Sequence, residues 1–223
     1  MLSGPSQHAV QVDSVMIFII ISSVILLLGV TAAMVYFVIR YSRKRNPKAS
    51  NISHNHLLEI TWIVLPTILV LFMFYYGWVI FSESREVPDG VMNVTVTGRM
   101  WAWDFNYPNG KKTDTLYLPV NKSAKLNLVS ADINHSFYIP AFRIKEDIIS
   151  GRENYMVVTP EEIGNYDIAC AEYCGMNHSL MYSKLIVVSQ TDFDRWVKTG
   201  LPVKEETPGD SVAVKDTLST VTN

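Results

Sequence analysis

The stretch VMIFIIISSVILLLGVTAAMVYFVI, residues 15–39, decides the architecture of the N-terminal part because it contains no charged side chain. As an α-helix at ~1.5 Å per residue it would be about 37 Å long, enough to cross a bilayer with some tilt. The alternative is a cleaved signal peptide. No Lys or Arg precedes the run, the run is too long, and no small-residue cleavage site follows it. We therefore expect a retained membrane span.

A second uncharged run covers residues 60–81, within an expected span at 57–81. Pro66 lies inside this run, and neighbouring helices in a membrane can accommodate the kink that a proline causes. Aromatic residues stand near both ends, as is typical of membrane interfaces: Trp62, Tyr75, Tyr76 and Trp78. The sequence therefore predicts two membrane-spanning helices.

The link between the spans, residues 40–56, carries five Lys and Arg residues and no acid, whereas residues 1–14 carry no Lys or Arg. The positive-inside rule keeps such a link in the cytoplasm and sends residues 1–14 and everything after Phe81 across the membrane. The exported part has 14 basic and 19 acidic residues, a net charge of −5 that weakly favours a cationic partner. The whole chain has a net charge of −2, which argues against nucleic-acid binding.

The exported part, residues 82–199, reads as short strands separated by turns. Val94 and Val96 alternate with polar residues, and residues 101–107 alternate aromatic with small or polar side chains before a Pro-Asn-Gly turn. Further strands are expected at residues 124–129, 137–139, 155–159, 166–169 and 181–188. This pattern predicts an antiparallel sandwich or barrel with Greek-key connections, then a short helix at residues 192–198 and a flexible polar tail at residues 200–223.

Both cysteines fall in the stretch CAEYCGMNH, residues 170–178, and Met181 follows three residues later. Thiolate, imidazole and thioether groups are ligands that suit copper. Two thiolates can bridge two copper ions if a second imidazole comes from a distant strand. His8 lies in the N-terminal segment and His54 and His56 lie in the link, so His135 is the remaining candidate.

Three other interpretations of these residues compete with copper. Cys170 and Cys174 could form a disulfide in an oxidising compartment. A Cys₂His₂ zinc site is the second, but it leaves Met181 without a role. His135 and Met181, each taken alone, are more often core residues than ligands. The joint arrangement favours copper.

With these residues the sequence resembles subunit II of the haem–copper cytochrome c oxidases over nearly the whole chain. That family has two N-terminal membrane helices and an exported cupredoxin domain with a binuclear copper centre, CuA. Its motif, H followed by C-x-E-x-C-x-x-x-H-x-x-M, is present in full: His135, Cys170, Glu172, Cys174, His178 and Met181.

The resemblance assigns a role to each residue of the motif. It implies that Cys170 and Cys174 bridge the coppers and that His135 and His178 are terminal ligands. It also implies that Met181 is an axial ligand and that Glu172 contributes its backbone carbonyl. In the family the carboxylate at the Glu172 position also reaches a magnesium ion shared with subunit I.

Three further stretches match the family. Residues 98–107 resemble its aromatic cluster, which makes Trp101 the point where an electron enters from cytochrome c. Residues 145–152 resemble the segment facing subunit I, although Ser150 stands where the family often has Pro. Residues 59–66 resemble the start of the second helix, which implies that Glu59 lies at the mouth of a proton pathway in subunit I.

The implied function is electron relay from cytochrome c to haem in subunit I, where oxygen is reduced to water with proton translocation. The implied location is a bacterial plasma membrane or the mitochondrial inner membrane, with both termini and the copper domain on the periplasmic or intermembrane side. Other oxidase subunits and lipid are the further partners. The sequence has no C-x-x-C-H motif, so no fused c-type haem is expected, and no N-terminal cysteine for a lipid anchor.

Other functions remain as alternatives at this point. A quinol oxidase subunit II would share the fold but generally lacks the copper ligands. A membrane-anchored copper chaperone would resemble thioredoxin and usually has one anchor. The copper domain of nitrous oxide reductase shares the ligand loop but is soluble.

Overall fold

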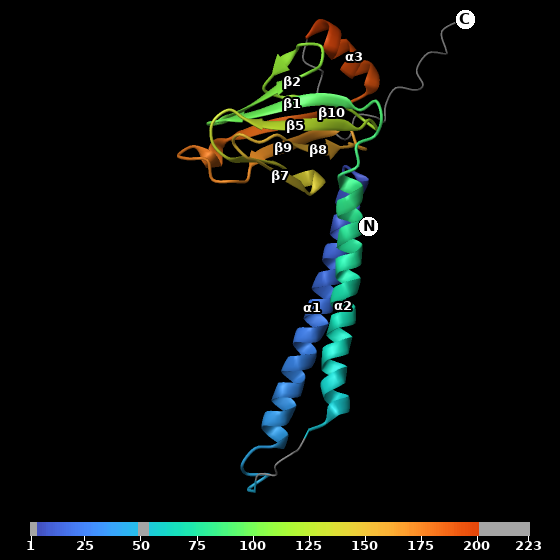
Figure 1. Ribbon diagram of the computed structural model, residues 1–223, viewed down its shortest axis with the longest axis vertical. Coiled ribbons are helices and arrows are strands. Elements are labelled where there is room, and N and C mark those ends of the chain that lie inside the picture. Colours follow the sequence, from blue (N-terminus) through green and yellow to red (C-terminus); the bar gives the residue numbers. More distant parts are fainter. Residues whose placement is uncertain (1–3, 49–53, 201–223) are drawn as a thin grey trace, which may run out of the picture. The chain divides into compact units, whose positions relative to one another are not determined.

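The computed structural model describes residues 4–48 and 54–200 and divides into two compact units (Figure 1). One is a helical unit within residues 10–83. The other, here called the sandwich unit, contains the rest of the described chain, residues 4–9 and 84–200. The sequence predicts a flexible tail at residues 200–223. Of these, only Gly200 belongs to the described residues.

Two long helices, α1 (Gln7–Arg40) and α2 (His56–Ser84), run side by side in Figure 1. Both are long and apolar enough to cross a membrane, and their large apolar side chains are exposed, as a lipid-facing helix requires. Phe18 of α1 contacts Phe72 of α2 with ring centroids 5.9 Å apart. Pro66 lies within α2 without ending it. Helix α1 begins inside the segment 1–14 that the sequence places outside the membrane.

The sandwich unit consists of two five-stranded sheets. The first has the order β3 (Lys112–Thr113), β2 (Ala102–Asn106), β1 (Met92–Arg99), β5 (Ala124–Ser130) and β8 (Asn154–Val158). The second has the order β4 (Leu116–Pro119), β10 (Tyr182–Val188), β9 (Gly164–Cys170), β6 (His135–Ile139) and β7 (Ile144–Ile148). The predicted architecture of two helices followed by an all-β sandwich is confirmed.

The sheets are mixed and not wholly antiparallel. Strand β1 pairs in parallel with β5, and β4 pairs in parallel with β10, while the other pairs are antiparallel. The chain crosses between the sheets after β3, β4, β5, β7 and β8, and such crossings allow neighbours that run in the same direction. Turn spacing in the sequence cannot reveal these crossings.

The core lies between the sheets and follows the alternation in the sequence. Val94, Val96, Trp103 and Phe105 are buried, and Trp103 contacts Phe137 of the opposite sheet edge-on with centroids 5.1 Å apart. Strand β2 begins only at Ala102. Trp101 therefore lies in the turn after β1 and not inside a strand.

A C-terminal helix, α3 (Gln190–Thr199), covers one end of the sandwich, as residues 192–198 predict. Ser189 caps the start of this helix, because its hydroxyl accepts a hydrogen bond from the backbone N–H of Asp192. Trp196 is buried and stacks on Tyr117 with ring centroids 4.5 Å apart. The helix ends at Gly200, whose φ of +71° suits glycine.

Candidate metal centre

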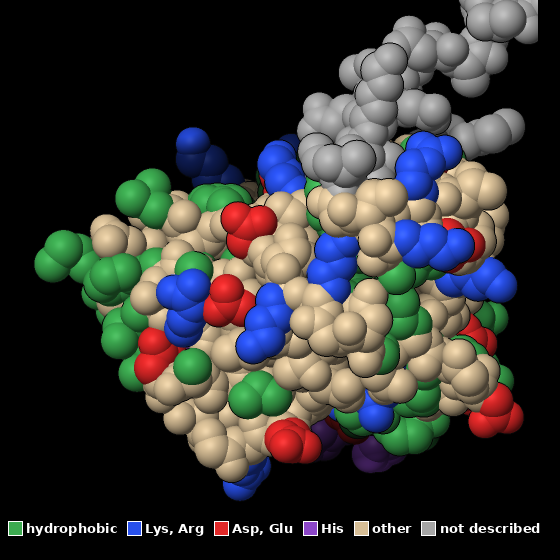
Figure 2. Space-filling model, turned by 90° about the horizontal axis from the view of Figure 1, so that it is seen from above, with side chains coloured by type: hydrophobic (Ala, Val, Ile, Leu, Met, Phe, Trp, Pro, Cys, Tyr) green, Lys and Arg blue, Asp and Glu red, His purple; other side chains and the backbone are tan. Residues whose placement is uncertain are grey.

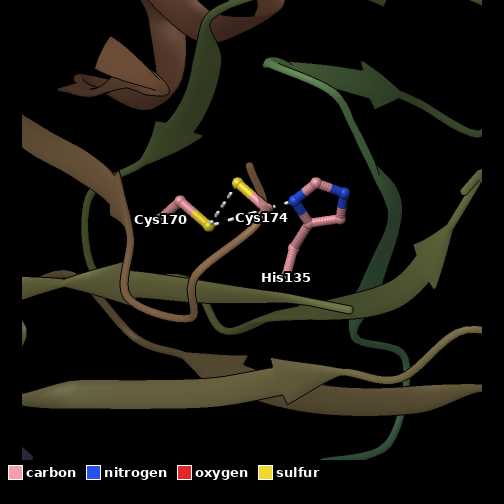
Figure 3. Close-up of side chains that lie close together, drawn as sticks. All are labelled: His135, Cys170 and Cys174. Carbon is pink, nitrogen blue, oxygen red and sulfur yellow. Dashed lines mark hydrogen bonds between the residues drawn. The ribbon is translucent and has the colours of Figure 1, made fainter. Parts of the chain in front are cut away.

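Pairing of β6 with β9 brings the distant histidine of the motif to the cysteines. In this register Phe137 lies opposite Cys170, so His135, the first residue of β6, lies beside the end of β9. Figure 3 shows the imidazole of His135 directed at the two sulfur atoms. The ligand atoms of His135, Cys170 and Cys174 all lie within 4.8 Å of one another.

Sulfur and nitrogen contacts extend this cluster to the other predicted ligands. The Sγ of Cys170 is 3.9 Å from His135 Nδ1 and 3.7 Å from the Sγ of Cys174. The Sγ of Cys174 is in turn 3.6 Å from His178 Nδ1 and 3.7 Å from the Sδ of Met181. A disulfide requires ~2.05 Å between the sulfurs, so the two cysteines are free thiols.

Backbone hydrogen bonds hold the connection between β9 and β10, here called the ligand loop (residues 170–181), in a compact form. At its base, the N–H of Cys170 donates to the carbonyl of Met181 over 3.1 Å. A 3₁₀ turn at His178–Leu180 follows, in which the N–H of Met181 donates to the carbonyl of His178. The motif spacing therefore folds four donor groups back onto one point.

The centre is largely shielded from water. His135, Cys174 and Met181 are fully buried, and Cys170 is 9% exposed. Burial and a hydrogen bond with Cys170 raise the pKa of the Cys174 thiol to about 11. A buried thiolate therefore needs a compensating positive charge, and a bound metal ion provides one.

Glu172 takes part in the cluster through its backbone. Its carbonyl accepts a hydrogen bond from the Sγ of Cys170 over 3.2 Å, which places the carbonyl oxygen beside the thiols. The side chain of Glu172 is exposed.

Trp101 lies against the ligand loop. Its indole Nε1 donates a hydrogen bond to the carbonyl of Cys174 over 3.0 Å. Gly175, with φ of +109°, permits this approach, because a Cβ there would lie 3.3 Å from Cζ2 of the indole. The predicted aromatic residue is therefore in direct contact with a predicted ligand.

Asp132 and Gly98 position His135, and sequence reasoning gave neither of them a role. Oδ1 of Asp132 lies 2.7 Å from His135 Nε2, and Gly98 leaves room for the imidazole, since a Cβ there would lie 3.3 Å from Cδ2 of His135. Burial alone would raise the pKa of Asp132, but hydrogen bonds from His135, Met100 and Ile133 outweigh it and lower the pKa. An acidic residue three positions before a predicted ligand was the available signal.

Glu59 lies far from this centre in the sequence, in the first turn of α2. Its two carboxylate oxygens face His54 Nδ1 at 3.5 Å and His56 Nδ1 at 3.4 Å. The two histidines of the link therefore have a carboxylate partner that the sequence did not indicate.

The donor set fits copper. Two thiols, two imidazoles and a thioether are soft or borderline ligands, whereas magnesium or calcium would require oxygen ligands. Met181 favours copper over a Cys₂His₂ zinc site, because its sulfur lies within the cluster and zinc sites do not use thioether.

The surface around the centre is apolar, and the wider surface has mixed charge. Exposed hydrophobic residues of the ligand loop and the start of β10 are Tyr173, Met176, Leu180 and Tyr182. In Figure 2 hydrophobic side chains gather at the left edge, where Figure 1 shows the orange ligand loop. Lys and Arg are interspersed with Asp and Glu across the face in Figure 2, so this face presents no field of one sign.

Two parts of one family match the chain. Residues 2–80 match the transmembrane domain of cytochrome c oxidase subunit II, and residues 111–191, which include all six motif residues, match its periplasmic domain. The chain is thus a membrane protein with two spans.

Proteins named cytochrome c oxidase subunit 2 are similar along most of the chain. The protein from Alkalihalophilus pseudofirmus is 32% identical over 222 residues, which cover 94% of this chain and 64% of that protein. The protein from Cereibacter sphaeroides is 26% identical over 221 residues, which cover 81% of this chain and 73% of that protein. A probable subunit 2 from Rickettsia bellii is 27% identical over 203 residues, covering 81% of this chain and 76% of that protein.

Solved structures are similar to about half of the chain. The periplasmic domain of subunit II of cytochrome oxidase from Bradyrhizobium japonicum is 31% identical, with a TM-score of 0.48, and covers 51% of this chain and 96% of that domain. The family matches and the two helices followed by a cupredoxin-like sandwich agree with the resemblance seen in the sequence. The chain belongs to the cytochrome c oxidase subunit II family.

Proposed function

We propose that this chain is the electron-accepting subunit of a terminal oxidase that oxidises cytochrome c and reduces oxygen to water with proton translocation. The observation that carries the proposal is the contact of all six motif residues around one buried point, inside the segment that matches the family's periplasmic domain. A quinol oxidase subunit or a thioredoxin-like chaperone would not require this donor set on a sandwich.

The six residues would hold a binuclear copper centre. Cys170 and Cys174 would supply its two thiolate ligands, His135 and His178 its two imidazole ligands, and Met181 and the backbone carbonyl of Glu172 would complete the ligand set. When bound, the copper pair supplies a centre that accepts and releases one electron. The ligand loop and β6 hold these donor groups in place, so the protein itself would have to move little when an electron arrives or leaves.

The surrounding residues keep water out and provide the approach for the donor. Burial of His135, Cys174 and Met181 keeps the local dielectric low. Trp101 is the residue at which an electron from cytochrome c enters, because its indole joins the partly exposed turn after β1 to the backbone of Cys174. With copper bound, the centre would pass the electron on to haem in subunit I.

The proposed orientation follows from the charge of the link. Residues 40–56 remain in the cytoplasm or its equivalent, and the sandwich unit lies on the periplasmic or intermembrane side. On that side the proposed partners are subunit I and cytochrome c, while lipid surrounds α1 and α2.

Two acidic residues have proposed roles toward subunit I. The exposed carboxylate of Glu172 is accessible to a magnesium ion that subunit I helps to bind. Glu59 lies at the link end of α2, where its contacts with His54 and His56 place three titratable groups at the proposed mouth of a proton pathway. Both roles would be measured in the assembled oxidase, as magnesium content and as proton uptake in Glu172→Gln and Glu59→Gln.

Electron paramagnetic resonance of the full chain, purified in detergent and loaded with copper, tests the proposed function. We expect a hyperfine pattern from one unpaired electron shared by two copper nuclei, together with two copper ions per chain. A pattern from a single copper nucleus, or metal analysis that finds zinc at this site in the native protein, would contradict the proposal.

A further inference from the structure

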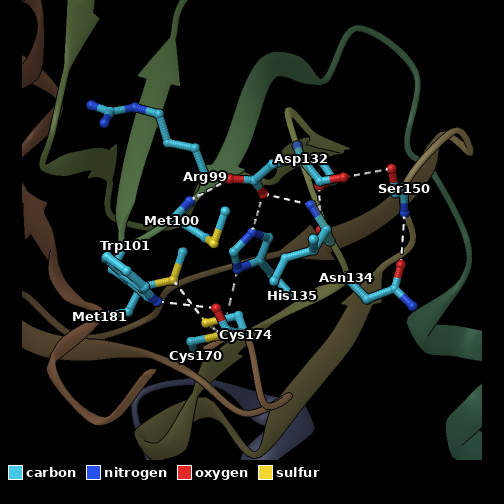
Figure 4. A network of polar contacts seen from close by, with 12 residues as sticks. Arg99, Met100, Trp101, Asp132, Asn134, His135, Ser150, Cys170, Cys174 and Met181 are labelled. Carbon is cyan, nitrogen blue, oxygen red and sulfur yellow. Dashed lines mark hydrogen bonds and ion pairs between the residues drawn. The ribbon is translucent and has the colours of Figure 1, made fainter. Parts of the chain in front are cut away.

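The carboxylate of Asp132 is the polar group that contacts the buried imidazole of His135 on the side away from the thiols. Oδ1 of Asp132 lies 2.7 Å from Nε2 of His135, while Nδ1 on the other edge of the ring lies 3.9 Å from the Sγ of Cys170 (Figure 4). The side chain of His135 is fully buried and that of Asp132 is 25% exposed. The ring is thus held between an acid and the ligand cluster.

A carboxylate in this position selects one tautomer of the ring. An ionised carboxylate only accepts hydrogen bonds, so Nε2 of His135 must carry the proton and donate it to Asp132. Nδ1 is then the unprotonated nitrogen with a lone pair, and it is the one that faces Cys170. A partner of this kind also makes the imidazole a stronger electron donor to a bound metal.

Asp132 is itself fixed from several directions. Oδ2 accepts a hydrogen bond from the N–H of Met100 over 2.6 Å, and Oδ1 accepts a second one from the N–H of Ile133 over 2.6 Å. The hydroxyl of Ser150 donates to the backbone carbonyl of Asp132 over 2.8 Å. The N–H of Ser150 donates to Oδ1 of Asn134 over 2.9 Å, in the same loop.

These contacts join three separate parts of the sandwich unit. Met100 lies in the turn after β1, Asp132 lies in the loop between β5 and β6, and Ser150 follows β7. Trp103 contacts His135 edge-on from β2, with ring centroids 6.1 Å apart, so the imidazole has an apolar neighbour as well as an acidic one. Such a network is more rigid than an isolated surface carboxylate would be.

We propose that Asp132 is a positioning residue that holds His135 as the Nε2–H tautomer, presents Nδ1 to the metal and stabilises the oxidised state of the copper pair. Ser150 acts behind it by holding the backbone of Asp132. This inference rests on the proposed copper site.

The test compares Asp132→Asn with the matched control Asp104→Asn in the full chain in detergent. Both substitutions remove one acid from the same region of the sandwich unit, but Asp104 pairs with Arg99 and not with His135. We expect Asp132→Asn to weaken copper binding by about 10–100-fold in chelator competition. We also expect it to shift the reduction equilibrium about tenfold toward the reduced state, which is a rise of ~59 mV in midpoint potential. Asp104→Asn should leave both values near those of the unaltered chain.

A measurement without copper tests the tautomer directly. Nitrogen-15 NMR of His135 in the copper-free chain should show the Nε2–H tautomer in the unaltered protein and in Asp104→Asn, and a mixture of tautomers in Asp132→Asn. A merely structural effect of the substitution would lower stability without changing the midpoint potential or the tautomer.

The outcomes separate this inference from the proposed function. If the unaltered chain binds no copper pair, the proposed function fails. If it binds copper, but Asp132→Asn matches Asp104→Asn in affinity, midpoint potential and tautomer, the role of Asp132 is wrong. If Asp132→Asn does not fold, Ser150→Ala tests the inference in its place. This substitution keeps the carboxylate of Asp132 and removes the hydrogen bond that Ser150 donates to the backbone carbonyl of Asp132. We expect about a fivefold weaker affinity for Ser150→Ala, and no change would overturn the inference.

Discussion

At the scale of single residues, the sulfur of Cys174 contacts three of the other predicted ligands. Its sulfur lies within 3.7 Å of Cys170 Sγ, His178 Nδ1 and Met181 Sδ. Replacing this sulfur therefore removes its contacts with Cys170, His178 and Met181 at the proposed metal site, while the two helices do not contain this residue.

The first prediction concerns the ligands. Cys174→Ser and His135→Ala should each abolish the spectrum of the copper pair and the oxidation of cytochrome c, while the chain still inserts into the membrane. Ser179→Ala, a change of an exposed residue in the same loop, is the control and should retain both properties. Full oxidase activity in either ligand variant would show that the ligand set is wrong.

The second prediction concerns the contact of Gly175 with Trp101. Gly175→Ala places a methyl group 3.3 Å from the indole at a φ of +109°, so we expect a loss of ~1–3 kcal/mol in the free energy of unfolding and slower electron donation by cytochrome c. Gly110→Ala is the matched control, because Gly110 also has positive φ but no atom within 4 Å of the added Cβ. Equal rates of electron donation in the two variants would remove Trp101 from the electron path.

At the scale of elements, a cluster around Arg85 fixes the start of the sandwich unit. The guanidinium lies 2.9 Å from a carboxylate oxygen of Glu146 in β7 and donates to the carbonyl of Tyr155 in β8. It also stacks on the ring of Tyr155, 4.7 Å from the centroid. One side chain therefore connects the segment after α2 to one strand of each sheet.

The third prediction follows from this cluster. Arg85→Ala leaves Glu146 without its cation in a half-buried position, so we expect a loss of about 1–3 kcal/mol in the free energy of unfolding. Arg195→Ala breaks the ion pair of an exposed arginine with Asp192 and should cost less than ~0.5 kcal/mol. Thermal unfolding of both variants in detergent measures the difference, and equal melting temperatures would contradict the role of Arg85.

The sequence predicts helices and strands well where one pattern of apolar residues, a long uncharged run or a strict alternation, continues through the whole element. The uncharged runs predict both spans, and the alternation at Val94 and Val96 predicts a strand with its buried face. Strand β7 was not predicted, because its sequence IKEDI places charged side chains on the exposed face of a sheet edge. Strands β3 and β4 were also not predicted, since they have two and four residues and are too short to show a period.

The candidate site could be predicted as a set of residues but not as a geometry. Cys170, Cys174, His178 and Met181 share one loop, so their spacing alone brings them together. His135 was predicted as a ligand only because the other histidines outside the loop lie in the N-terminal segment and in the link. Its closeness to the cysteines depends on the pairing of β6 with β9. Asp132 and Gly175 act through contacts made by the folded chain, which no motif records. The roles of all these residues stay predictions until metal is measured.

At the scale of the whole molecule, the fourth prediction concerns orientation. Cysteine labelling should modify Asn109→Cys, in the exposed turn after β2, from outside intact cells, and Asn46→Cys, in the link, only after permeabilisation. The unaltered chain is the control, because its two cysteines are buried. Labelling of Asn46→Cys in intact cells would show that the positive-inside rule fails for this chain.

The fifth prediction concerns copper removal. A ligand that binds the folded chain and not the unfolded one stabilises it by about 4 kcal/mol at a free concentration of 1,000 times its dissociation constant, and we expect copper to act in this way. A chelator should therefore lower the melting temperature of the unaltered chain and have no effect on Cys174→Ser. An unchanged melting temperature in the unaltered chain would mean that the centre does not couple to folding.

The carboxylate of Asp132 has a consequence for electron tunnelling. One of its oxygens holds the N–H of Met100, next to Trp101, and the other holds the imidazole of His135. The rate of electron tunnelling falls exponentially with distance, so the proposed entry at Trp101 requires a turn whose position is held. Because one carboxylate binds both the backbone of this turn and the imidazole, we expect the separation between Trp101 and His135 to vary less than it would without Asp132.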